Sequence, residues 1–272
     1  CVDERASESL AQLDLPSLRL LSLSQLETPE LLKVKPERTR AEYCWTLTPF
    51  TPAFVFQEDS SVNRVTYLDA DLWIYKSPKE IFSELERSGK SVVRTERAYH
   101  PPYDMSLTSG KYCVQFMTFE RGRGEVVRKW WEEKCIEWCF DRFEPGRFGD
   151  QKYLDDWSDR FPDEVHVLEE RAWARAPWNA IRFLGEGLVF YHFHGLRISR
   201  MGVLTGSYPI PRSVRRLLYA PYKEDLEWGL SRMTEIGMNI PIQAPLSRII
   251  RQTLGCIRRV LRNPGDLWRL CN

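Results

Sequence analysis

The sequence predicts a globular α/β protein; length and composition indicate a globular domain, and the order of the expected elements indicates the class. At 272 residues the chain is long enough to bury a substantial core. Its hydrophobic content of 43% and charged content of 28% are ordinary for a globular protein. Short apolar runs with the pattern of strands alternate along the chain with segments that carry helical spacing or helix-capping signals. We therefore expect one large α/β domain, alone or with an appendage.

The expected elements follow from local patterns. Leu10 and Leu13 lie at helical spacing, and Thr28 before Pro29 is a typical start of a helix. The segment 111–119 alternates well enough for a strand, whereas 96–110 reads as a long loop. In chain order we expect helix 5–13, strand 18–22, a helix opening at Thr28, helix 38–48, strand 65–68, helix 77–85, strand 91–94, strand 111–119, helix 123–140, a helix opening at 149–151, and then strand 165–168, strand 188–192 and helix 222–233.

The most informative stretch is the apolar strand 64–68 followed by two aspartates, Asp69 and Asp71. An extended backbone turns residues i and i+2 to the same side, so the two carboxylates can converge at the end of the strand. Two carboxylates that close repel each other unless a cation lies between them, and Mg²⁺ or Mn²⁺ carrying a ligand's phosphates is the usual cation. The alternative is a surface turn with two solvated aspartates, which the preceding apolar strand makes harder to sustain.

Further motifs follow the carboxylate pair in a fixed order. The chain carries Y-L-D-A-D-L at 67–72, G-D-Q-K-Y-L at 149–154, A-P-W-N at 176–179 and Y-H-F-H-G at 191–195. In this order they resemble the motifs of family-8-like nucleotide-sugar glycosyltransferases, in particular a bacterial branch. The resemblance covers roughly residues 1–222.

The resemblance implies a GT-A fold, which is a Rossmann-like mixed sheet flanked by helices. It implies a catalytic domain over 1–204 and a helical extension over 205–272. The first four residues, Cys1-Val2-Asp3-Glu4, resemble the end of the family's second strand. We therefore expect a chain that lacks the family's first strand.

The resemblance also assigns candidate site residues. Asp69, Asp71 and His192 would bind Mn²⁺ or Mg²⁺, and Asp150 with Gln151 would act at the sugar or the acceptor. Asp150 could instead be a plain helix N-cap. Substrate contacts are also expected from Arg38, Trp178, Asn179, His194 and Arg197, in addition to Asp69, Asp71 and Asp150. The alternatives are a solvated helix charge for Arg38 and a buried, hydrogen-bonded imidazole for His194. Cys113 and Gln115 replace the family's usual pattern, so no donor-sugar role is carried over to this strand.

The implied activity is that of a metal-dependent hexosyltransferase. It would move a sugar from a nucleotide-diphosphate sugar, a UDP-sugar by preference, to a glycan or lipid-linked acceptor with retention of configuration. The alternative is a catalytically degenerate protein that binds a nucleotide sugar or a carbohydrate. A metal-dependent phosphotransferase would also use paired aspartates, but the sequence has no Gly-rich phosphate loop. A net charge of +1 gives no reason to expect a nucleic-acid partner.

The segment 246–262 predicts an amphipathic helix with an apolar stripe beside arginines. Such a helix suits either the surface of an anionic membrane or docking of its apolar face on the catalytic domain. The seven cysteines form no C-x-x-C pair, which favours a reducing compartment. We therefore expect a cytoplasmic protein, with peripheral contact at the inner face of the cell membrane as the second possibility.

Overall fold

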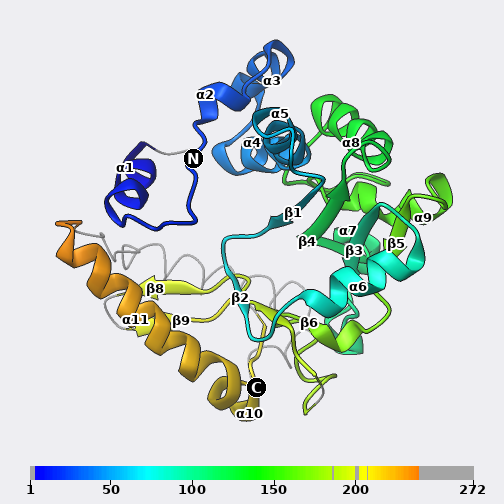
Figure 1. The fold of residues 1–272 in the computed structure, drawn as a ribbon. Coiled ribbons are helices and arrows are strands. Elements are labelled where there is room, and N and C mark those ends of the chain that lie inside the picture. The colour runs from blue at the N-terminus through cyan, green and yellow to red at the C-terminus, as the bar shows by residue number, and fades with distance from the viewer. Residues whose placement is uncertain (1–3, 186, 200–201, 207, 239–272) are drawn as a thin grey trace. The chain divides into compact units, whose positions relative to one another are not determined.

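The structure is a computed structural model that describes residues 4–185, 187–199, 202–206 and 208–238 (Figure 1). This part of the chain has a mixed α/β architecture with helices flanking mixed sheets. The chain divides into two compact units, Cys1–His192 and Phe193–Asn272. The expected domain boundary at residue 204 stays a prediction.

The main sheet of the first unit has four strands in the order β1-β4-β3-β5. Strand β4 is antiparallel to both of its neighbours, whereas β3 and β5 are parallel, so the sheet is mixed. Within the described residues β1 pairs with β4 alone and lies at an edge. The central strand β4 is buried along nearly its whole length, which explains its mostly apolar sequence. The strands are β1 (Arg64–Leu68), β3 (Val92–Glu96), β4 (Tyr112–Glu120) and β5 (Val165–Val167).

A second, three-stranded sheet of the same unit has the order β2-β7-β6. Its strands are β2 (Leu72–Ile74), β6 (Ala174–Arg175) and β7 (Phe190–His192). Because β2 and β7 are antiparallel, Leu72 pairs with His192. This register brings the start of β2 and the end of β7 together.

Helices cover the sheets of the first unit, and two of them, α3 and α4, begin at threonine N-caps. Thr28 caps α3, since its hydroxyl accepts a hydrogen bond from the Leu31 amide at 3.3 Å. The helices are α1 (Glu4–Gln12), α2 (Leu23–Leu26), α3 (Pro29–Val34), α4 (Arg40–Leu47), α5 (Thr51–Glu58), α6 (Lys79–Ser88), α7 (Ser106–Ser109), α8 (Glu125–Glu137) and α9 (Trp157–Arg160), with 3₁₀ turns at Lys35–Glu37, Thr48–Phe50, Pro101–Tyr103, Lys152–Asp156 and Arg171–Trp173.

The second unit begins with Phe193, whose ring stacks on Tyr222 with 3.7 Å between the ring centres. Its strands β8 (Arg197–Ser199) and β9 (Gly202–Leu204) pair antiparallel. The helices are α10 (Arg212–Val214), a π-helical turn (Arg215–Tyr219) and α11 (Ala220–Glu235). The strand expected at 188–192 is therefore not the last one.

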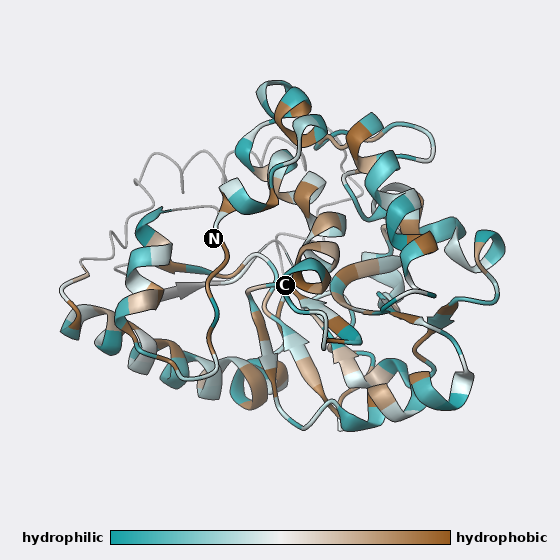
Figure 2. Ribbon diagram, turned by 45° about the horizontal axis from the view of Figure 1, so that its top comes forward, coloured by the Kyte–Doolittle hydropathy of each residue, from teal (hydrophilic) through white to brown (hydrophobic). Residues whose placement is uncertain are grey.

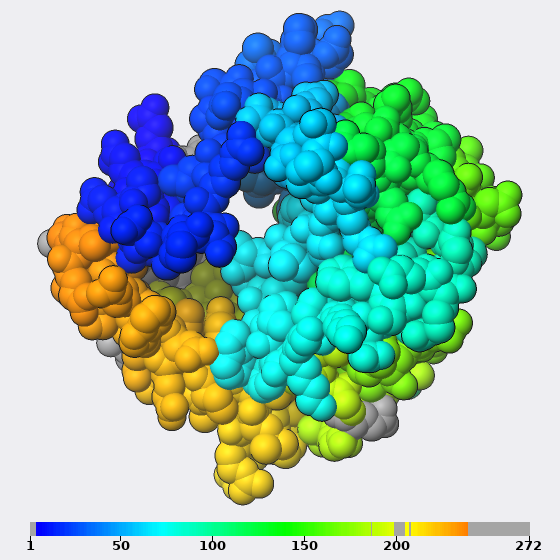
Figure 3. Space-filling view, in the orientation of Figure 1, coloured from blue at the N-terminus to red at the C-terminus, as the bar shows by residue number. Residues whose placement is uncertain are grey.

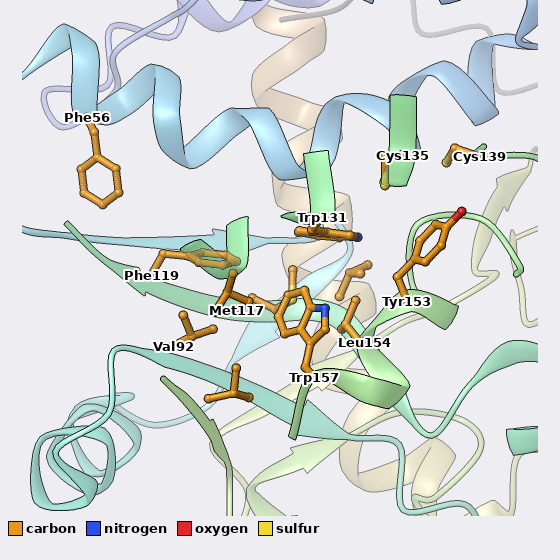
Figure 4. Close-up of a cluster of buried hydrophobic side chains, with 13 residues drawn as sticks. Phe56, Val92, Met117, Phe119, Trp131, Cys135, Cys139, Tyr153, Leu154 and Trp157 are labelled. Atoms are coloured by element: carbon orange, nitrogen blue, oxygen red, sulfur yellow. The ribbon is translucent and has the colours of Figure 1, made fainter. Parts of the chain in front are cut away.

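The largest hydrophobic core of the first unit lies between β4 and α8 (Figure 4). Trp131 from α8 meets Trp157 edge to face, with 5.5 Å between the ring centres, and lies beside Phe119 of β4. The indole of Trp131 also donates a hydrogen bond to the carbonyl oxygen of Asp150 at 2.7 Å. This core therefore fixes the loop that carries Asp150.

Figures 2 and 3 agree with this layout within the first unit. The helices carry hydrophobic and hydrophilic residues along their length, and strands of both kinds of colour lie between them (Figure 2). The segments that hold β1 and α5 lie beside those that hold β4 and α8 (Figure 3). The carboxylate pair thus follows an edge strand that packs on the central strand.

Three expectations differ from the structure or fall outside it. The strand expected at 18–22 is wrong, because this segment has no regular structure and is largely exposed. Of the strand end expected at the N-terminus only Glu4 is described, and it begins α1. The helix expected at 246–262 lies outside the described residues. Among the helices that are described, none is long and apolar enough to cross a bilayer.

Glu42 ties α4 to the chain after α8, and its removal should be costly. Its carboxylate accepts hydrogen bonds from the Thr39 amide and the Asp141 amide, both at 2.8 Å. The residue is only 9% exposed, so water cannot readily replace these bonds. Glu42→Ala leaves two amides without acceptors and is expected to lower the free energy of unfolding by about 2 kcal/mol. Urea denaturation measures this loss. Glu37→Ala, at an exposed position, is the control and should change stability little.

Candidate metal centre

The two aspartates of the candidate site lie in a tight turn between β1 and β2. Asp69 directly follows β1, and Asp71 directly precedes β2. The Leu72 amide donates to the Asp69 carbonyl oxygen at 3.3 Å and closes the turn. The expected convergence of the carboxylates is therefore present, but a turn produces it rather than a continuous extended strand.

His192 joins the pair from the end of β7, which the strand register places opposite Leu72. Its Nε2 lies 2.9 Å from the Asp71 Oδ1 and 3.7 Å from the Asp69 Oδ2. One ligand atom from each of the three residues lies within 4.8 Å of the others. The structure thus brings together the three residues that the sequence proposed as metal ligands, and their binding of a metal stays a prediction.

The donor set of this cluster fits a divalent cation. Two carboxylates and an imidazole suit Mn²⁺, and the carboxylates also suit Mg²⁺. The side chain of His192 is 5% exposed, whereas that of Asp71 is 44% exposed. The cluster is therefore held from the interior and open on the Asp71 side. Three protein ligands leave the remaining positions of an octahedral ion for water or for phosphate oxygens.

The charges of the cluster are coupled. Burial raises the pKa of Asp69, although the neighbouring His192 and the Tyr67 hydroxyl act in the opposite direction. Burial lowers the pKa of His192, but its contacts with Asp71 and Cys113 outweigh this and raise it to about 10. Without a metal, the imidazole therefore holds a proton between the carboxylates, and a bound cation would take the place of this positive charge.

A third carboxylate, that of Asp150, lies near Asp69. Asp150 is 3% exposed, and burial together with the charge of Asp69 raises its pKa to about 7. Thr48 hydrogen-bonds Asp150 and Tyr67, and the Tyr67 hydroxyl donates to the Asp69 Oδ1 at 2.9 Å. The Asp150 Oδ2 has no hydrogen-bond partner among the residues that the structure describes. Asp150 is not a helix N-cap, because Gln151 precedes the 3₁₀ turn. A buried carboxylate with a perturbed pKa and an unused oxygen is typical of a functional site.

Three further predicted residues of the first unit, Gln151, Trp178 and Asn179, lie around a buried arginine, Arg97. Its guanidinium donates to the Gln151 side chain and lies 4.6 Å from the centre of the Trp178 ring. Trp178 in turn meets His192 edge to face, with 5.5 Å between ring centres. The Asn179 side chain hydrogen-bonds backbone groups, including the Arg97 carbonyl oxygen at 2.9 Å. The substrate contacts expected of Trp178 and Asn179 stay predictions.

Arg38, His194 and Arg197 have different surroundings. Arg38 is buried, stacks 3.8 Å from the centre of the Phe140 ring and donates to the Ile136 carbonyl oxygen, so the alternative of a solvated helix charge is wrong. His194 and Arg197 belong to the second unit and are exposed, so the alternative of a buried imidazole at His194 is also wrong. The substrate-binding roles of these three residues stay predictions.

Three residues of the site were not singled out as site residues from the sequence. Arg97 is a buried cation whose charge opposes the rise that burial causes in the pKa values of Asp69 and Asp150. Gln115 contacts His192 with 2.7 Å between its Oε1 and the imidazole Nδ1, and Tyr67 binds Asp69. A glutamine within a mostly apolar central strand was the available signal for Gln115, because buried polar groups need partners.

Comparisons with known proteins place the chain among bacterial relatives. No family model matches it. It is 30% identical over 252 residues to the uncharacterized protein YfnF of Bacillus subtilis (strain 168), covering 86% of this chain and 82% of that protein. It is 31% identical over 217 residues to the uncharacterized protein YfnD of the same organism, covering 73% and 68%.

Two solved structures are also similar in part. Mouse xyloside xylosyltransferase 1 in its apo form gives a TM-score of 0.39 at 17% identity, over 61% of this chain and 72% of that one. A glycosyltransferase involved in the glycosylation of the major capsid of PBCV-1 gives 0.42 at 13% identity, over 65% and 75%.

Proposed function

We propose that this chain, which belongs to the family of the Bacillus subtilis proteins YfnF and YfnD, is a metal-dependent glycosyltransferase of the GT-A type. The donor is a nucleotide-diphosphate sugar, preferentially a UDP-sugar. The acceptor is a glycan or a lipid-linked glycan, and the transfer of a hexose retains its configuration. The ordered motifs give the reaction class.

The observation that carries this proposal is the meeting of Asp69, Asp71 and His192 at one point, with the buried Asp150 close by. Solvated aspartates in a surface turn would have no need of a buried histidine from a strand far along the chain. A cluster held from the interior and open on one side suits a cation that must also bind a ligand.

Departure of a nucleoside diphosphate places negative charge on the leaving group, and a divalent cation stabilises that charge as a Lewis acid. Asp69, Asp71 and His192 would hold the cation. Asp150 and Gln151 would act at the sugar or the acceptor. Arg97 fixes the Gln151 side chain by donating to its carbonyl oxygen, so the orientation of this amide is set before substrate binds.

The carboxylate of Asp150 would contact the transferred sugar. Its free Oδ2 can accept a hydrogen bond from a sugar hydroxyl, which would remove an unsatisfied buried acceptor. A positive charge that develops on the reacting sugar would also be stabilised by a nearby carboxylate. Peripheral membrane contact through 246–262 and cytoplasmic localisation remain part of the proposal as expectations of the sequence.

A donor panel tests the proposal. The protein is incubated with UDP- and GDP-sugars in the presence of Mn²⁺, and release of the nucleoside diphosphate is followed with and without EDTA. We expect slow release from one donor, or a small group of donors, that stops when EDTA removes the cation. Binding of a donor without any release would favour the degenerate binding protein instead. If no donor binds and none is cleaved, the proposed function is wrong.

A further inference from the structure

Gln115 lies in the middle of β4 and is 1% exposed. A buried amide is costly unless its donors and acceptor are used, because water no longer satisfies them. Here they are used at the candidate metal centre. The side-chain Oε1 lies 2.7 Å from the His192 Nδ1, and the side-chain Nε2 donates to the Thr95 hydroxyl at 3.3 Å.

The same residue also contacts the first carboxylate of the pair through its backbone. The carbonyl oxygen of Gln115 accepts a hydrogen bond from the Asp69 amide at 3.0 Å. Gln115 therefore touches two of the three candidate metal ligands, one through the backbone and one through the side chain. The backbone contact survives any substitution at this position, whereas the contact with His192 depends on the side chain alone.

The contact with His192 decides which imidazole nitrogen carries the proton when the ring is neutral. An amide oxygen only accepts hydrogen bonds, so the Nδ1 that faces it must carry a hydrogen. The lone pair of the neutral imidazole is then on Nε2, which is the nitrogen that faces Asp71 and Asp69 at 2.9 and 3.7 Å. Thr95 contacts the other end of the amide, where its hydroxyl accepts a hydrogen bond from the NH₂ group at 3.3 Å.

We propose that Gln115 is a positioning residue that holds His192 in its Nδ1–H tautomer, with the Nε2 lone pair directed at the cation site. Partners of this kind, behind a metal-binding histidine, orient the ring and set its tautomer. An amide does so without adding negative charge beside Asp69, Asp71 and Asp150. This inference rests on the proposed metal dependence, but it concerns binding of the cation and makes no assumption about the sugar or the acceptor.

Binding of Mn²⁺ without any nucleotide sugar tests the inference, with free Mn²⁺ measured by EPR. Gln115→Met has a similar length and no comparable acceptor, and we expect its dissociation constant for Mn²⁺ to rise by about 10- to 100-fold. Gln115→Glu keeps an acceptor oxygen and should bind Mn²⁺ far more tightly than Gln115→Met. Thr118→Val is the matched control, since Thr118 lies on the same strand and bonds Thr66 at 3.0 Å instead of His192. It should leave the constant unchanged.

A spectroscopic measurement reports the tautomer directly. With ¹⁵N-labelled histidine and Zn²⁺ as a diamagnetic probe, His192 of the wild type should show a protonated Nδ1 and a metal-bound Nε2. The chain has four histidines, so His192 can be assigned by comparison with His192→Gln. If Gln115→Met does not fold, Thr95→Val replaces it and should weaken Mn²⁺ binding about threefold, since it loosens the amide.

Equal Mn²⁺ affinity of the wild type and Gln115→Met, or an unprotonated Nδ1 in the Zn²⁺ form, overturns the inference and leaves the proposed transferase activity untouched. A wild type that binds no Mn²⁺ overturns both the inference and the proposed metal dependence. A wild type that binds Mn²⁺ as expected but cleaves no donor sugar contradicts only the proposed function.

Discussion

Asp71→Asn is expected to lose about 10³-fold in Mn²⁺-dependent release of nucleoside diphosphate from the donor sugar. The reason is that a neutral amide is a poor ligand for a divalent cation, and stabilisation of the leaving group by the cation is worth several kcal/mol. Asp71 is the most exposed of the three candidate ligands, with 44% of its side chain accessible, so its substitution should disturb the core least. Initial rates at saturating donor, with Mn²⁺ varied, measure the loss.

The control for this substitution is Asp163→Asn, which removes the same charge at an exposed position near β5. It should retain the rate of the wild type. Thermal unfolding of both variants shows whether the fold is intact. An Asp71→Asn variant that folds, and that keeps its rate and its dependence on Mn²⁺, would exclude the proposed metal site.

The sequence predicted the elements that local patterns determine. Strand β1 and the aspartates after it follow from an apolar run that ends in two carboxylates, and the capped start of α3 follows from Thr28. The segment 18–22 has a strand-like composition, but none of the three described sheets pairs with it. Strand propensity without a neighbouring strand is too weak to fix the backbone.

The sequence predicted only those parts of the site in which the residue types alone indicate the chemistry. Paired aspartates suggest a cation by themselves, whereas His192 was placed beside them by family resemblance. Its partner Gln115 lies 77 positions earlier in the chain, and no local pattern relates the two residues. The contact depends on the registers of two different sheets, since β4 pairs with β1 and β7 pairs with β2. Long-range register is the information that a single sequence lacks.

The lack of long-range information also explains why the sequence did not predict the burial of Arg38 and Arg97. Arg38 lies at the start of an expected helix, and Arg97 lies in an expected loop. Their charge alone predicts that both are exposed to solvent. Each is instead buried with its guanidinium against an aromatic ring, Phe140 for Arg38 and Trp178 for Arg97. Stacking of this kind stabilises a buried cation, and it depends on which ring the fold places there. Only the structure distinguishes the arginine beside the carboxylates from the one beside α8.

Asp150→Asn is expected to stabilise the protein at pH 8 and to lower its transferase rate by at least about 100-fold. The folded-state pKa of Asp150 is about 7, above the ordinary value of 3.8, because the carboxylate is buried beside Asp69. Because folded Asp150 holds its proton more tightly than the unfolded chain does, it contributes stability that is fully present below about pH 4. This contribution is lost as the pH rises through about 7. At pH 8 the wild type therefore holds a buried charge that the unfolded chain would solvate.

The free energy of unfolding of the metal-free wild type should fall between pH 4 and pH 7, and the Asp150→Asn variant should lack that part of the slope. The difference between about 7 and 3.8 sets an upper limit of about 4 kcal/mol, and we expect a gain of about 2 kcal/mol at pH 8, since the new amide must also find partners. Urea denaturation in EDTA across this pH range measures the slope, with the exposed Asp225→Asn as control. If the free energy of unfolding has the same pH dependence in the wild type and in Asp150→Asn, then ionised Asp150 does not destabilise the folded protein. If Asp150→Asn is more stable and has lost its transferase rate, then Asp150 destabilises the folded protein and is required for the reaction.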